Sequence, residues 1–300
     1  MNRVILVTGI LTLWFTDVVV PYSRAQNNSA TTNQPVVCHH EIRHNPNFSI
    51  HWVRLELANT NIHVHVAKAG DVPTNSGHWV TTLLPSSEIA ARENFDVTIN
   101  GDFFNAQDTV DVEGKKTGYV RGKLSEPVGP AMTEGKVWHQ PVNPRPCLEI
   151  TSSNTARIYN FLPSEPLDKE AREIIGGGQI IVGNGKMLTG NKSFFSIRHP
   201  RTAVGIDKTG TRLLLWEVDG RQPNLSIGMT LSEVATEMIR LGCDTALNLD
   251  GGGSSTFVWR DEKTRKLKIV NSPSDTHERS VVDVLGATIK LPLLETETSD

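Results

Sequence analysis

Cysteine is scarce in this 300-residue sequence, which has three cysteines and neither a Cys-x-x-Cys pair nor a His-Glu-x-x-His motif. These absences remove the usual sequence support for a zinc site. The net charge is −3, so no excess of basic residues indicates a nucleic-acid partner. We therefore assign no metal ligand, no cofactor and no nucleic-acid partner, although neighbouring carboxylates leave a metal requirement open. His63 and His65 share one face of an expected strand, and a solvated strand face is the favoured interpretation.

Two familiar active-site motifs are also missing. The segment Gly252-Gly-Ser-Ser-Thr256 departs from G-x-S-x-G at its last position, which argues against an α/β-hydrolase nucleophile. The glycine-rich segment Gly176 to Gly183 is followed by Asn184 instead of Lys-Ser/Thr, so it is not a phosphate-binding P-loop.

A long apolar run occurs only near the first residue. Val4 to Phe15 is apolar, follows Arg3, and precedes the small-x-small site Ser23-Arg-Ala25. This pattern predicts a signal peptide over residues 1–25, with a membrane anchor as the alternative. The run is short for a bilayer span, which favours cleavage. We expect a secreted or periplasmic protein with no membrane span after cleavage.

The three cysteines are Cys38, Cys147 and Cys243. Export permits a disulfide, but an odd number leaves one cysteine over, and the sequence does not select the pair. If a bridge forms, Cys38 with Cys147 is the expected pair. Cys243 follows the helix-ending Gly242 and is expected to be a small core residue.

Expected helices and strands alternate in two similar units. In the first, Ser86 or Ser87 caps a helix to about Glu93, and the strand Phe95–Ile99 runs into Asn100. In the second, Thr230 and Glu233 form a capping box for a helix over 231–241, and the strand Thr245–Leu249 runs into Asp250. We expect an α+β fold: a single domain with a mixed β-sheet packed by helices. The predicted divisions are a signal peptide (1–25), a leader (26–48), the domain (49–292) and a tail (293–300).

The segment Asp250-Gly-Gly-Gly-Ser-Ser255 carries the strongest chemical signal. Gly251, Gly252 and Gly253 allow a backbone to approach a ligand closely and to turn N–H groups toward an anion. Ser254 and Ser255 add hydroxyl donors, and Asp250 can act as an acid or a base. A hairpin turn with a flexible tip is the structural alternative.

Three further segments place polar groups beside expected strands. Arg201 lies in Arg198-His-Pro-Arg201, and an arginine holds phosphate in a bidentate fork. Asp219 and Arg221 lie at the end of another expected strand, and Arg279 lies just before a further one. For a single arginine, a solvated loop is the alternative.

Taken together, these segments resemble the phosphodiester glycosidase family. The similar pieces occur in the family's order and are Ile99-Asn-Gly-Asp-Phe-Phe104, Gly176-Gly-Gly-Gln179, His199-Pro-Arg-Thr-Ala-Val-Gly205, Val218-Asp-Gly-Arg221, Gly228-Met-Thr-Leu-Ser-Glu233, Leu247-Asn-Leu-Asp-Gly-Gly-Gly-Ser-Ser-Thr256 and Glu278-Arg-Ser-Val-Val282. The glycine-serine piece with its leading Asn-Leu-Asp is the most specific. The resemblance implies the family's fold over the domain.

The resemblance also implies hydrolysis of a sugar-1-phosphodiester at the anomeric C–O bond, on glycans or exopolysaccharide. Such a reaction needs a stabilised oxocarbenium-like transition state and a neutralised phosphate. The expected catalytic residues are Asp250, Asp102, Arg201 and Asn100. The expected substrate-binding residues are Asp219, Arg221, Gly251, Gly252, Gly253, Ser254, Ser255 and Arg279. Which carboxylate acts as the acid and which as the base stays open. For Asp102, the alternative to a catalytic role is a role in the turn alone.

Two other functions remain open at this point. A phosphodiesterase that cleaves the P–O bond would use the same residues. A non-catalytic glycan-binding protein of envelope or exopolysaccharide assembly would show fewer polar groups at strand ends and more exposed aromatic residues.

Overall fold

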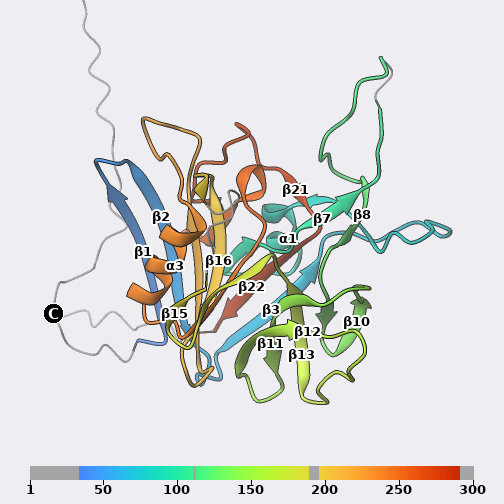
Figure 1. The fold of residues 1–300 in the computed structure, drawn as a ribbon. Helices are drawn as coiled ribbons and strands as arrows, with labels where there is room; N and C mark the ends of the chain where they lie inside the picture. The colour runs from blue at the N-terminus through green and yellow to red at the C-terminus, as the bar shows by residue number, and fades with distance from the viewer. Residues whose placement is uncertain (1–33, 111–112, 189–195, 291–300) are drawn as a thin grey trace, which may run out of the picture. The chain divides into compact units, whose positions relative to one another are not determined.

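Antiparallel sheets dominate the computed structural model, which describes residues 34–110, 113–188 and 196–290 (Figure 1). The largest sheet has seven strands in the order β1-β2-β17-β16-β18-β14-β15. Their bounds are β1 Val36–Arg43, β2 Phe48–Glu56, β17 Arg212–Val218, β16 Arg201–Ile206, β18 Thr245–Asn248, β14 Gln179–Gly183 and β15 Lys186–Met187. Along these strands the residues of one face pack into the core shared with the other sheets, and those of the other face pack against a helix.

Two five-stranded sheets complete the main framework. One has the order β20-β19-β6-β22-β3, with β20 Leu267–Ile269, β19 Phe257–Arg260, β6 Val97–Asn100, β22 Asp283–Ile289 and β3 Ile62–Lys68. The other has the order β10-β9-β13-β11-β12, with β10 Lys136–His139, β9 Ala131–Thr133, β13 Ala171–Gly176, β11 Arg145–Thr151 and β12 Ala156–Phe161. Small sheets join β21 Ser280–Val281 to β5 Leu84–Pro85, and β4 Thr81–Thr82 to β8 Leu124–Pro127 and β7 Phe104–Ala106.

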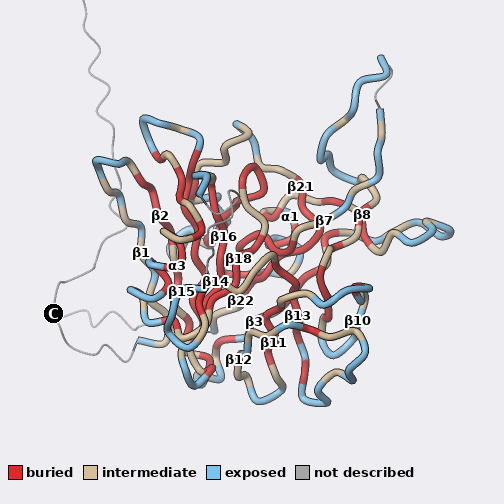
Figure 2. Tube along the Cα trace, viewed as in Figure 1, coloured by how far each residue is buried: buried red, intermediate tan, exposed pale blue. Residues whose placement is uncertain are grey.

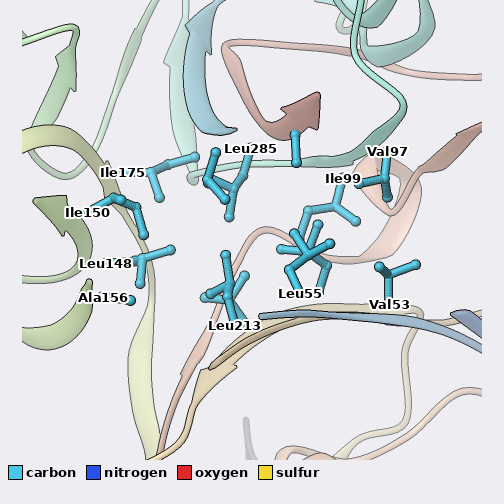
Figure 3. Packing of buried hydrophobic residues seen from close by; sticks show 14 of the residues in the cluster. Val53, Leu55, Val97, Ile99, Leu148, Ile150, Ala156, Ile175, Leu213 and Leu285 are labelled. Carbon is cyan, nitrogen blue, oxygen red and sulfur yellow. The ribbon is translucent and has the colours of Figure 1, made fainter. Parts of the chain in front are cut away.

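The main core fills the space between the three large sheets. Figure 3 shows Val53, Leu55 and Leu213 of the seven-stranded sheet facing residues of the two five-stranded sheets. Those partners are Val97, Ile99 and Leu285 of one sheet and Leu148, Ile150, Ala156 and Ile175 of the other. Burial follows the central strands, including β16, β18 and β22, whereas many connections are exposed (Figure 2). Burying these apolar side chains supplies the main driving force for bringing the sheets together.

Two α-helices have bounds within the described residues. Helix α3 (Leu231–Arg240) begins at the expected capping box, since Thr230 accepts from the Glu233 backbone and Glu233 accepts from that of Thr230. Its apolar side packs on the seven-stranded sheet. Helix α1 (Ser86–Arg92) begins after Pro85 and has no side-chain cap of its own. The Ser87 backbone N–H instead donates to the Glu278 carboxylate at 2.7 Å, so a distant residue caps this helix.

The expected mixed sheet packed by helices is therefore wrong. The strand pairs are antiparallel throughout the described sheets, and helices are a small part of the chain. Both expected helices are present, although neither Ser86 nor Ser87 caps α1 through its side chain, and the regular elements of the described chain between them are mainly the strands β6 to β17 joined by loops. Antiparallel neighbours that are consecutive in sequence, such as β16 and β17, need only a short turn between them, so no helical crossover is required there.

The expected cysteine pair is also wrong. Cys38, Cys147 and Cys243 are all free thiols. Cys38 is exposed on β1, whereas Cys147 is buried on β11 in a different sheet. Cys243 packs among apolar residues beneath α3, as expected for a core residue.

The described residues from 34 onward belong to one compact unit. The predicted signal peptide, residues 26–33 of the leader and the whole tail lie outside the described residues, whereas the described part of the leader contains β1. In the described part of the chain, no helix has the length and apolar character needed to cross a bilayer. The predicted domain bounds stay predictions.

Candidate active site

The ends of β6 and β18 meet where the seven-stranded sheet faces a five-stranded one. Asn100, the last residue of β6, is fully buried, and its Nδ2 donates to the Asp250 carbonyl at 2.8 Å. Its Oδ1 accepts from Thr202 Oγ1 at 2.7 Å and from the Thr256 backbone at 3.1 Å. The Asp250 backbone N–H donates to the Gly101 carbonyl at 3.0 Å. One amide thus ties three segments together and fixes the start of the glycine loop.

The glycine loop consists of Gly251, Gly252 and Gly253, and its glycines leave room for arginine side chains. A Cβ on Gly252 would lie 2.9 Å from Arg221 Nη2. A Cβ on Gly253 would lie only 2.1 Å from Arg279 Nη2. Gly252 also has φ +65°, a conformation that side chains disfavour. Close guanidinium approach therefore explains why glycines occupy this turn.

Arg279 is held beside the loop by several partners. Its Nη2 donates to Asp275 at 2.6 Å, and its Nη1 donates to Ser254 Oγ at 3.4 Å. The guanidinium also lies over the Tyr119 ring, 4.9 Å from its centroid. These contacts fix a positive charge next to Asp250, because Ser254 also hydrogen-bonds that carboxylate.

Arg201 takes a different direction from the one expected. It pairs with Val218 across the β16–β17 ladder, and Val218 belongs to the face that packs under α3. Its Nε donates to the Met229 carbonyl at 3.1 Å, and Nη2 donates to that of Ile197 at 2.9 Å. A Cβ on Gly251 would still lie 3.7 Å from Arg201 Cδ. The Arg201 head group thus donates to backbone carbonyls, and its catalytic role stays a prediction.

A positive field nevertheless surrounds the loop. Burial, together with the nearby Arg221 charge, lowers the pKa of Arg201 to about 10. Burial and the two arginines also lower the pKa of His199, whose Nδ1 lies 3.4 Å from Arg221 Nη2. Arg221 is exposed, so of these cations it is open to an incoming anion. Bound phosphate would relieve the mutual repulsion of these groups.

Asp250 is poised to exchange a proton near neutral pH. Burial raises its pKa to about 6, although Ser254 and the Arg279 charge act in the opposite direction. Its Oδ1 accepts from the Gly251 backbone at 2.9 Å. A carboxylate with such a pKa, on a residue that is only partly buried, has the properties of a general base.

Asp102 lies deeper, at 2% exposure. Its two carboxylate oxygens accept from the backbones of Phe103 and Gly129, at 2.8 and 2.6 Å. A Cβ on Gly176 would lie 2.4 Å from Asp102 Oδ2, so this glycine makes room for the carboxylate. The contacts identify Asp102 as a brace between segments, and its catalytic role stays a prediction.

The carboxylate of Asp283 was not among the residues selected from the sequence. It accepts from the Asp102 backbone at 2.8 Å and would meet a Cβ on Gly101. Burial raises the pKa of Asp283 and that of Asp102; the Asp250 charge adds to the effect on both, and the Asp283 charge adds to the effect on Asp102. A charged residue inside the apolar run Val281-Val-Asp-Val-Leu285 is a signal that identifies such a group.

Asp219 lies behind the loop at 1% exposure. Its Oδ1 accepts from the Ser272 backbone at 2.7 Å and from Asn271 at 3.3 Å. Asn271 also donates to the carbonyl of buried Ser255 at 3.1 Å. Asp219 thereby supports the segment that follows the loop, and its substrate-binding role stays a prediction. Its carboxylate, with His51 and Glu217, forms a buried group that could hold a metal ion.

The structure therefore gathers part of the predicted set. Around the loop lie Asn100, Asp250, Gly251, Gly252, Gly253, Ser254, Arg221 and Arg279. Asp102, Asp219 and Ser255 lie beneath it, and Arg201 points toward the α3 face. The arrangement presents one carboxylate between backbone amides and two guanidinium groups, which suits a small anionic ligand.

The sequence of this chain is similar to those of several known proteins. The family model for phosphodiester glycosidases matches residues 93–288. The SPbeta prophage-derived protein YomE of Bacillus subtilis (strain 168) is 38% identical over 103 residues, 34% of this chain and 14% of that protein. N-acetylglucosamine-1-phosphodiester alpha-N-acetylglucosaminidase is 43% identical in Bos taurus and 41% in Homo sapiens over 65 residues, 22% of this chain and 12% of each relative. The matched segments are thus a small part of these curated relatives.

Solved structures share the fold over a much larger region. The zebrafish N-acetylglucosamine-1-phosphodiester alpha-N-acetylglucosaminidase catalytic domain, auto-inhibited by its pro-peptide, has a TM-score of 0.60 at 22% identity. That alignment covers 85% of this chain and 84% of the zebrafish chain. A Burkholderia pseudomallei K96243 protein has a TM-score of 0.59 at 17% identity, covering 82% and 74%. With the family model matching well over half of its residues, the chain belongs to the phosphodiester glycosidase family.

Proposed function

We propose that this chain is a secreted hydrolase that cleaves a sugar-1-phosphodiester at the anomeric C–O bond. The observation that carries the proposal is the position of Asp250 beside a glycine loop flanked by Arg221 and Arg279. Family membership supports phosphodiester glycosidase chemistry. The sugar substrates are glycans or exopolysaccharide bearing such a diester.

In this mechanism the diester anion binds between the two guanidinium groups. Arg221 and Arg279 lie against Gly252 and Gly253, so a phosphate over the loop contacts both side chains. They neutralise the charge that develops on the phosphate as the C–O bond breaks. Arginine suits this task because its planar fork matches two phosphate oxygens.

Asp250 acts in its ionised form. A phosphate monoester is a good leaving group, so protonation by an enzyme acid is not required for departure. The remaining demands are activation of water and stabilisation of the oxocarbenium-like transition state, and a carboxylate meets both. Asn100 positions Asp250 through its carbonyl, while Asp102, Asp219 and Arg201 hold the surrounding segments.

Hydrolysis in water containing oxygen-18 tests the bond that breaks. A panel of sugar-1-phosphodiesters is incubated with the purified chain, and both products are analysed by mass spectrometry. Label in the free sugar is expected, because water attacks the anomeric carbon. Label in the phosphate would instead establish P–O cleavage, and no turnover with measurable binding would indicate a glycan-binding protein.

Export is a separate proposal that rests on the residues 1–25 pattern. N-terminal sequencing of natively produced protein should find a chain that begins near Gln26, outside the cytoplasm. An intact Met1 in the soluble cytoplasm would contradict it.

A further inference from the structure

A second group of polar side chains lies at the end of the main core. His51 of β2 and Glu217 of β17 are direct partners in the antiparallel ladder, so their side chains share one face of the sheet. Asp219 follows two residues after Glu217 and faces the same way. Ligand atoms of the three residues all lie within 4.8 Å of one another.

These groups are buried without an evident cation. Their exposed fractions are 5% for His51, 0% for Glu217 and 1% for Asp219. Within the described part of the chain, no lysine or arginine forms an ion pair with either carboxylate. Burying two carboxylates without a lysine or arginine partner carries a desolvation cost that a bound cation would offset.

One carboxylate oxygen has no partner at all. Asn271 donates to Glu217 Oε1 at 3.3 Å, but the buried Glu217 Oε2 lacks any hydrogen bond. A buried acceptor left unsatisfied in this way costs free energy. This unsatisfied oxygen belongs to one of the three clustered residues, and it is an observation separate from their clustering.

The distance between His51 and Asp219 also suits a shared ion better than a direct hydrogen bond. His51 Nε2 lies 3.8 Å from Asp219 Oδ2, which is too far for a hydrogen bond. Ligand atoms that each lie about 2.1 Å from one ion are separated by about 3 to 4.2 Å. The hydrogen bonds to Asp219 come to Oδ1, from Ser272 and Asn271, so Oδ2 faces His51.

We propose that His51, Glu217 and Asp219 bind a divalent first-row transition ion, Zn²⁺ or Mn²⁺. An imidazole nitrogen favours such ions over Ca²⁺ and Mg²⁺, which prefer all-oxygen sites. The ion compensates both carboxylates and supplies a partner for Glu217 Oε2. It joins β2 to the end of β17 and so fixes the turn that carries Arg221. Its role is structural, because the three ligands are buried.

Metal content and refolding test the site independently of hydrolysis. The protein is unfolded in guanidinium with EDTA, desalted, and refolded with Zn²⁺, with Mn²⁺ or without metal. Mass spectrometry should find about one ion per refolded chain, and the bound ion should raise Tm by about 5 °C or more. Less than about a tenth of an ion per chain with an unchanged Tm would overturn the site.

Glu217→Gln and His51→Asn locate the ion. Each should lower metal content at least tenfold and remove the metal-dependent rise in Tm. Glu56→Gln is the matched control, since Glu56 lies on β2 and pairs with Arg212 outside the cluster. It should bind metal like the wild type. Full metal content in both cluster variants would place the ion elsewhere and contradict the assignment. If a variant fails to fold, the wild-type refolding comparison still decides whether an ion is bound.

Discussion

Asn100 Nδ2 donates to the backbone carbonyl of Asp250 at 2.8 Å, joining residues that are 150 positions apart. The bond connects the end of β6 to the segment that leaves β18, in two different sheets. The expected catalytic carboxylate is thus fixed through its backbone, while its side chain remains partly exposed. The backbone of Asp250 is therefore held rigidly while its carboxylate stays available to a ligand.

Asp250→Asn should lower kcat about a hundredfold or more while the fold stays intact, because an amide cannot accept a proton. Steady-state kinetics on a sugar-1-phosphodiester measures the loss, and circular dichroism checks the fold. Asp108→Asn is the control, since Asp108 is an exposed carboxylate that pairs with Lys116 on the surface. Near-wild-type turnover of Asp250→Asn would remove Asp250 from the mechanism.

The pH profile should follow the pKa of Asp250, which burial raises to about 6. If the ionised form is active, kcat/KM falls as the pH drops through about 6. The free energy of unfolding changes with pH in the opposite direction, because the pKa of Asp250 in the folded protein exceeds its unfolded value of about 3.9. The contribution to stability is full below about pH 4 and is lost as the pH rises through the folded pKa.

Urea unfolding between pH 4 and pH 7 measures this contribution. Wild type should lose more stability than Asp250→Asn over this interval, because the variant lacks the Asp250 carboxylate and the charge with which it raises the pKa of Asp102 and Asp283. Equal slopes for the two proteins would mean that the pKa of Asp250 is close to its ordinary value.

Gly253→Ala should lower activity because the added methyl group disturbs the side chains beside the glycine loop. The added Cβ would lie 2.1 Å from both Arg279 Nη2 and Asp275 Oδ2, so this ion pair must move. We expect kcat/KM to fall about 10- to 100-fold, the range for losing a charge-assisted hydrogen bond. Gly77→Ala is the control, because a Cβ there meets no atom within 4 Å and strains only a positive φ. Unchanged kinetics for Gly253→Ala would show that the position of Arg279 is unimportant.

Arg221 and Arg201 should respond differently to replacement by alanine. Arg221 is exposed, so Arg221→Ala should weaken diester binding and leave Tm nearly unchanged. Arg201→Ala should also lower Tm, because the carbonyls of Met229 and Ile197 lose their donor. Thermal unfolding combined with KM separates the two cases. A large loss of Tm in Arg221→Ala would contradict the assignment.

Asn100→Ala should destabilise the fold by about 3 kcal/mol, because three buried hydrogen-bond partners lose their bonds. Those partners are the Asp250 carbonyl, Thr202 Oγ1 and the Thr256 N–H. Urea unfolding measures the effect, and Asn105→Ala is the exposed control. A change in the free energy of unfolding below about 0.5 kcal/mol, typical of surface substitutions, would show that the Asn100 hydrogen bonds do not stabilise the fold.

Local signals in the sequence were sufficient for several elements. The capping box of Thr230 and Glu233 and the apolar spacing behind it correctly predicted α3. Asn100 and Asp250 were also recognised as strand-end residues, and both strands end there or just before. Such signals act within a few residues, so they are present in the sequence itself.

Pairing between distant strands was decided only by the tertiary structure. The sequence placed Arg201 with Asp250, but the register with Val218 turns its side chain toward α3. It also gave no indication that His51 lies opposite Glu217 or that Asp283 meets Asp102. A strand exposes alternate residues on opposite faces, and a shift by one residue exchanges them, so the face is fixed only when the sheets pack together.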